Sequence, residues 1–170
     1  MSALFDVELG GPELLTALAT LFWWWVLRRL RGKPWRFAVV SLAGTFLHEL
    51  AHFVVGAVTG AKPVSFRIFP QRTEQGWTLG SVTFENMTLL NAAPVALAPL
   101  LLLALAPLLG LYWAAPAAQA ANWSTWLLAS YVCANALDAG WPSSTDIKVG
   151  ADSALMYGGV ATLLWWLWPG

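Results

Sequence analysis

Two histidines and a glutamate lie within five residues of one another, in the segment His48-Glu49-Leu50-Ala51-His52. On an α-helix, positions i and i+4 lie on one face, so both imidazoles can reach a single zinc ion. Glu49 follows the first histidine directly, where its carboxylate can act as general base on a metal-bound water. The chain contains no other histidine. The sequence therefore predicts a zinc centre with Glu49 as its catalytic residue.

The surroundings of this motif argue against a chance occurrence. HExxH also arises on amphipathic helices of soluble proteins, where its residues form a solvated face. Here the flanking residues 43–47 and 53–57 are almost entirely apolar, so the segment has little polar surface. Two histidines and a glutamate in an apolar span are costly unless they have partners. We therefore expect the motif to bind a metal.

A third ligand has to come from elsewhere, because catalytic zinc sites use three protein ligands and keep one position open. With no histidine left and a single cysteine, Cys133, a carboxylate is the natural choice. An acid at the start of a helix, as expected for Asp152, is favourable without any metal. The candidates are Asp138, Asp146 and Asp152, with Glu74 and Glu85 less favoured because they lie on a polar loop.

The composition is that of a membrane protein. Of 170 residues, 58% are hydrophobic and 11% are charged, against about 25% charged in a soluble domain. The net charge is zero, which gives no electrostatic basis for binding nucleic acid. Many of the twelve tryptophans lie near the ends of apolar runs, as in the aromatic belts of membrane interfaces. We expect one domain over residues 1–170, multi-pass in a lipid bilayer, in the plasma membrane of a prokaryote.

Five apolar segments approach the ~20 residues that a helix needs to cross the hydrocarbon core. The expected fold is therefore an all-α polytopic membrane protein with about five transmembrane helices. These segments are residues 13–30, 37–58, 87–113, 123–137 and 151–168.

Residues 61–85 have a different pattern. Val64, Phe66 and Ile68 alternate with polar residues, which is the period of a β-strand. Residues 77–79 and 81–84 indicate further strand, broken by Gly80. A short β-hairpin after the motif helix is the preferred interpretation, with a solvated connecting loop as the alternative.

The motif helix, the hairpin and a later aspartate together resemble the site-2 proteases, a family of intramembrane zinc metallopeptidases, of which this chain would be a small divergent member. In that family a later span supplies an aspartate ligand within Leu-Asp-Gly, after a proline. Leu137-Asp138-Ala139-Gly140 is similar to that element but has no proline ahead of it. Asp146 follows Pro142 and Ser143, which can break a helix and direct a side chain back to the metal. Asp146 is therefore the preferred third ligand and Asp138 the alternative.

The resemblance implies a hydrolase, an endopeptidase that uses Zn²⁺ to cleave membrane protein or peptide substrates within the bilayer. Asn91 and Asn135 are candidate substrate-binding residues, since an amide can orient a carbonyl or stabilise an oxyanion. Each could instead satisfy a hydrogen bond between helices. The alternative function is a non-catalytic membrane scaffold or transporter-like protein with a structural zinc site.

Overall fold

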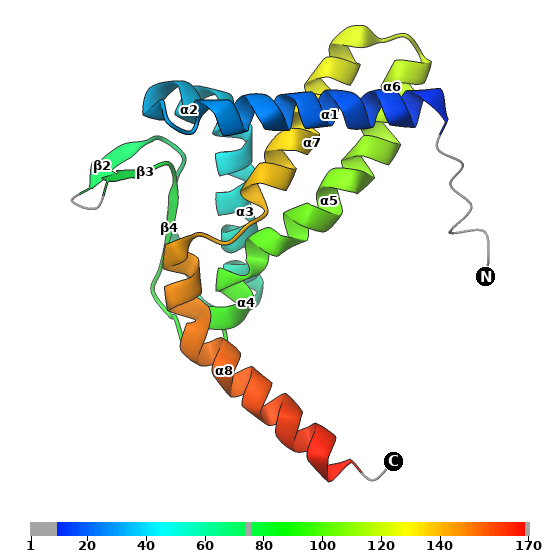
Figure 1. Ribbon diagram of the computed structural model, residues 1–170. Helices are drawn as coiled ribbons and strands as arrows, with labels where there is room; N and C mark the ends of the chain where they lie inside the picture. The colour runs from blue at the N-terminus through cyan, green and yellow to red at the C-terminus, as the bar shows by residue number, and fades with distance from the viewer. Residues whose placement is uncertain (1–9, 74–75, 169–170) are drawn as a thin grey trace. The chain divides into compact units, whose positions relative to one another are not determined.

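The computed structural model describes residues 10–73 and 76–168, and it is 72% helical with a small β region. This confirms the predicted mostly helical class and the β-structure after the motif helix. The chain packs as two compact units. Among the described residues, the first unit comprises 10–44 and 102–138, and the second comprises 45–73, 76–101 and 139–168. Figure 1 labels the elements of both.

The first unit is built from helices that pack through small residues. Its elements are α1 (Gly11–Leu30), α2 (Pro34–Val40), most of α5 (Leu101–Leu109), the π-helical turn η2 (Gly110–Ala114), α6 (Ala115–Gln119) and α7 (Trp123–Ala139). Helix α1 packs against η2 and α6, where Ala114 and Ala115 are buried together with Thr16. The indole of Trp126 donates to Thr16 Oγ1 at 3.2 Å, which fixes α7 against α1.

A break at Ser41 separates α2 from α3 (Leu42–Val58), so the predicted segment 37–58 is not one straight helix. Helix breaks leave backbone groups without intrahelical partners, and these must find others. Two side chains of α7 supply them. Tyr131 donates its hydroxyl to the Val40 carbonyl at 2.7 Å, and the Gly44 amide donates to Asn135 Oδ1 at 3.1 Å.

The second unit combines α3 with a β region. Strands β1 (Pro63–Arg67) and β4 (Ser81–Phe84) pair antiparallel, and β2 (Gln71–Thr73) pairs with β3 (Gly76–Thr78) between them along the chain. Phe66 on β1 packs edge-on against Phe46 and Phe53 of α3, with ring centroids 6.0 and 5.9 Å apart. Phe66 therefore holds the hairpin against the helix that carries the motif.

Helices α4 (Ala92–Ala96) and α8 (Ser144–Leu167) complete the second unit and pack closely against each other, with the 3₁₀ turn η1 (Ala98–Leu100) after α4. A Cβ at Gly150 would lie 2.6 Å from Ala96 Cβ, so only glycine allows this approach. Ser153 is fully buried and its hydroxyl accepts from the Ala93 amide at 2.9 Å. Tyr157 donates to the Leu90 carbonyl at 2.6 Å.

The prediction of about five transmembrane helices is wrong for the described residues. One helix, Ala98–Gln119, is long and apolar enough to cross a membrane, and α2 with α3 gives at most a second, bent span. Charged and polar side chains lower the hydropathy of the other segments. Examples are Glu13 and Arg28 in α1, Ser130 and Asn135 in α7, and Asp152 and Ser153 in α8. Segment 87–113 is interrupted at Leu97, so its apolar helix starts later than predicted.

The buried hydrogen bond between α4 and α8 gives a test of this packing. Ser153→Ala leaves the buried Ala93 amide without its acceptor, which should cost about 1–3 kcal/mol of unfolding free energy. Thr162→Ala is the control, because Thr162 only bonds to the Gly158 carbonyl on an exposed part of α8. Denaturant titration in detergent should separate the two variants. Equal stability of both would contradict the role given to Ser153.

Candidate metal centre

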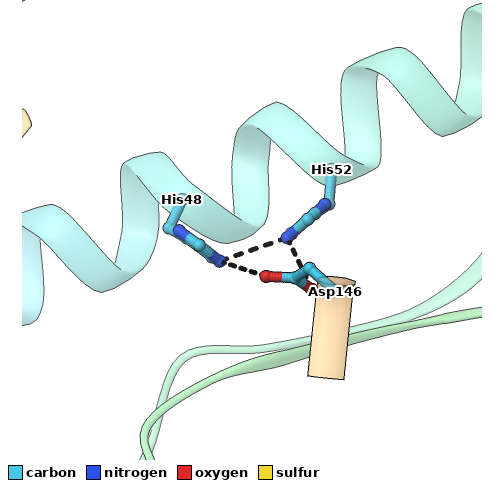
Figure 2. A group of neighbouring side chains, drawn as sticks. All are labelled: His48, His52 and Asp146. Atoms are coloured by element: carbon cyan, nitrogen blue, oxygen red, sulfur yellow. Dashed lines mark hydrogen bonds and ion pairs between the residues drawn. The ribbon is translucent and has the colours of Figure 1, made fainter. Parts of the chain in front are cut away.

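His48 and His52 lie one turn apart on α3, and their Nε2 atoms point toward each other, as Figure 2 shows. The ring centroids are 4.7 Å apart and the two Nε2 atoms are 3.1 Å apart. His52 is buried, with 6% of its surface exposed. On the surface helix of a soluble protein, the same motif would face solvent. The helical spacing thus brings the two imidazoles together as the motif predicts.

Asp146 approaches the same two nitrogens from the first turn of α8 (Figure 2). Its Oδ2 lies 3.4 Å from His48 Nε2 and its Oδ1 lies 3.3 Å from His52 Nε2. The ligand atoms of the three residues all lie within 4.8 Å of one another. The predicted grouping of His48, His52 and Asp146 is therefore present, and such a group could hold a metal ion.

A capping box fixes the direction of the Asp146 side chain. Ser143 is the N-cap of α8 and its hydroxyl accepts from the Asp146 amide at 3.2 Å, while Asp146 Oδ2 accepts from the Ser143 amide at 2.6 Å. The same carboxylate therefore caps the helix and faces both imidazoles.

Backbone carbonyls determine which nitrogen of each imidazole carries the proton. His48 Nδ1 lies 2.7 Å from the Ala139 carbonyl oxygen, and His52 Nδ1 lies 2.8 Å from that of Val95. Because a carbonyl can only accept, each Nδ1 is the donor, and the Nε2 of a neutral ring keeps its lone pair. The lone pairs of both Nε2 atoms and the Asp146 carboxylate then point toward one position. A cation at that position would be bound by all three groups, so this set of donor atoms fits a metal.

Glu49 is buried next to this group without belonging to it. Its side chain is 8% exposed, and within the described part of the chain no hydrogen bond is made by its carboxylate. The backbone of Gly80 and the side chain of Thr45 lie against it. The adjacent position on α3 thus places a carboxylate beside the candidate metal ligands, as expected for a base.

The other acidic candidates lie elsewhere. Asp138, the alternative third ligand, accepts from Arg31 Nη2 at 2.8 Å and lies 3.7 Å from Arg28 Nε, with its side chain 8% exposed. This buried carboxylate is therefore neutralised by arginine within the first unit. Asp152 and Glu85 are exposed, and Glu74 lies outside the described residues.

Asn91 and Asn135, the candidate substrate-binding residues, both bond to the protein's own backbone. Asn91 accepts from the Thr88 amide at 2.7 Å and donates to the Asn86 carbonyl at 2.9 Å. Asn135 accepts from the Gly44 amide and donates to the Tyr131 carbonyl at 3.1 Å. Asn135 thus makes a hydrogen bond between helices, whereas Asn91 bonds to the turn that precedes α4. A role in substrate binding stays a prediction for both.

Sequence reasoning missed three features of the site. The carbonyls of Ala139 and Val95 give no side-chain signal, because any residue type carries that group. The capping box did have a signal, since serine followed three residues later by an acid is typical of a helix N-terminus. Ser143 and Asp146 fit that spacing.

No protein-family model, curated protein or solved structure matches this chain. The resemblance to site-2 proteases accordingly stays a prediction, carried by the motif helix, the hairpin and a later aspartate.

Replacement of Asp146 and replacement of Asp138 should have opposite effects on the zinc content. Purified protein should bind about one zinc per chain, and His48→Ala, His52→Ala or Asp146→Ala should remove most of it, because each deletes one ligand atom. Asp138→Ala should retain zinc, since that carboxylate pairs with arginine. Elemental analysis of the purified variants measures this. Zinc lost from Asp138→Ala and kept by Asp146→Ala would reverse the assignment.

Proposed function

We propose that this protein is an intramembrane zinc-dependent endopeptidase that hydrolyses peptide bonds of membrane protein substrates. One observation carries the proposal: the Nε2 atoms of His48 and His52 and the carboxylate of Asp146 converge within 4.8 Å of one another. Imidazole nitrogen and carboxylate oxygen are common zinc ligands. Among the described residues this group has three members, and three protein ligands leave a fourth position for water, as catalytic zinc sites do.

In the proposed hydrolysis, different residues bind the metal, orient the imidazoles and transfer the proton. Bound zinc would polarise the scissile carbonyl and lower the pKa of a coordinated water. His48, His52 and Asp146 hold the ion, and the carbonyls of Ala139 and Val95 keep the imidazoles in the required tautomer. Glu49 accepts a proton from the attacking water and later delivers it to the leaving amine.

The exposed apolar surface supports a location in the bilayer. Only 33% of the most apolar stretch in helix Ala98–Gln119 is buried, whereas the core helix of a soluble protein is mostly buried. Its exposed side chains include Leu101 at 61% and Leu108 at 49%. The end of α8 exposes Leu163, Leu164, Trp165, Trp166 and Trp168. Soluble monomers rarely expose continuous apolar surface of this kind, so we place the chain in the membrane.

Glu49→Gln tests the chemistry. The substitution keeps the shape of the side chain but removes the proton acceptor, so cleavage should fall by on the order of 10²–10⁴-fold with zinc unchanged. Cleavage of a co-reconstituted membrane peptide is measured in liposomes, and zinc is quantified on the same samples. Glu85→Gln is the matched control, because Glu85 is exposed. If Glu49→Gln cleaves as fast as the parent, the peptidase proposal is wrong and the structural-zinc alternative replaces it.

Fractionation tests the location. The protein should stay in the membrane pellet after extraction at high pH and enter solution only with detergent. Leu108→Arg, on an exposed part of the helix Ala98–Gln119, should reduce insertion, since an arginine at the centre of a span costs about 2.5–3.5 kcal/mol. Recovery of the parent protein in the soluble fraction would contradict the proposed location.

A further inference from the structure

Gly80 lies between β3 and β4, and its backbone is in close contact with α3. A Cβ built on Gly80 would lie 2.7 Å from Glu49 Cγ, 2.8 Å from Glu49 Oε1 and 2.8 Å from Thr45 Cγ2. Thr45 and Glu49 are four residues apart, so they share one face of α3. Separations below 3.0 Å require the neighbouring atoms to move. No side chain therefore fits at position 80 while Glu49 stays where it is.

The requirement for glycine at this position is one of space and not of backbone conformation. Among the described glycines, Gly60 has a positive φ of 75° and Gly80 does not. An alanine at position 80 could thus adopt the same backbone angles. The Cβ of that alanine would, however, overlap the volume that the Glu49 side chain occupies.

Packing, and not hydrogen bonding, holds the Glu49 carboxylate. Within the described part of the chain its oxygens make no hydrogen bond, and its side chain is 8% exposed. A glutamate side chain has three rotatable bonds, so an unbonded one needs walls to define its rotamer. The helix supplies one wall and the Gly80 backbone supplies another. We propose that Gly80 is a positioning residue, whose lack of a side chain sets the place of the catalytic carboxylate.

This inference rests on the proposed function, because it takes Glu49 as the base. A general base must lie within about 2.6–3.2 Å of the group whose proton it takes. Displacement of a catalytic group by about 1 Å can cost on the order of 10²-fold in rate. Gly80→Ala should therefore lower kcat by roughly 10–100-fold, with zinc retained and KM changed far less than kcat.

Gly159→Ala is the matched control, because a Cβ at Gly159 meets nothing within 4 Å. It should leave kcat, KM and zinc unchanged. The comparison separates an effect of crowding at position 80 from the general effect of replacing glycine by alanine.

A double-mutant cycle tests the contact without any activity measurement. Gly80→Ala should lower Tm in the parent, because overfilling a packed site is destabilising. Glu49→Ala removes both Glu49 atoms that the new methyl group would meet. The drop in Tm caused by Gly80→Ala should therefore be smaller in the Glu49→Ala background. If Gly80→Ala alone does not fold, recovery of the folded double variant supports the contact, and failure of the double variant to fold overturns it.

The possible results separate this inference from the proposed function. An active parent with unchanged kcat in Gly80→Ala overturns the positioning role and leaves the peptidase standing. Loss of zinc in Gly80→Ala also overturns it, since the glycine would then support the metal ligands and not the base. A zinc-loaded parent that hydrolyses no peptide overturns the proposed function, and the positioning role with it, whatever the Tm cycle shows. Reduced kcat, intact zinc and coupled Tm values together support the inference.

Discussion

The geometry of this candidate site depends on two backbone carbonyls that accept hydrogen bonds from the imidazoles. Because the carbonyls of Ala139 and Val95 cannot donate, they force the Nδ1 tautomer and turn both Nε2 lone pairs toward one point. A ring rotated by half a turn would lose that bond and direct a carbon at the metal position. The packing of α4 against α8, with its close contact at Gly150, is therefore part of the site, because α4 carries Val95.

Asp146 links the start of a helix to the metal position. Its carboxylate accepts from the Ser143 amide and so caps α8, and the positive end of the helix dipole favours its negative charge. The same two oxygens face His48 and His52. A ligand that is already fixed by a cap loses little conformational freedom on binding an ion. The capping box would thus hold Asp146 in place as a third ligand before an ion binds.

Spacing on one helix was enough to predict the pairing of His48 with His52, because α-helical geometry alone fixes it. Asp146 followed from the helix-breaking residues before it, which constrain the backbone locally. The role of Asp138 could not be predicted, since its Leu-Asp-Ala-Gly context is similar to a ligand motif while its partner, Arg31, is distant in the sequence. The number of spans was overestimated because apolar runs were counted without the polar residues and the helix breaks that interrupt them.

Charge balance bears on how this apolar chain holds the buried Glu49 carboxylate beside the half-buried Asp146. Isolated charges are very costly in a low-dielectric interior, and buried acids are paired or bind metals. The first unit meets this requirement for Asp138 with Arg31. Among the described residues, no lysine or arginine forms an ion pair with Glu49 or Asp146. With both imidazoles neutral and both carboxylates ionised, a bound divalent cation would balance the charge in full, whereas a monovalent cation would leave one negative charge uncompensated. The proposed zinc ion would thus offset the cost of burying Glu49 beside Asp146.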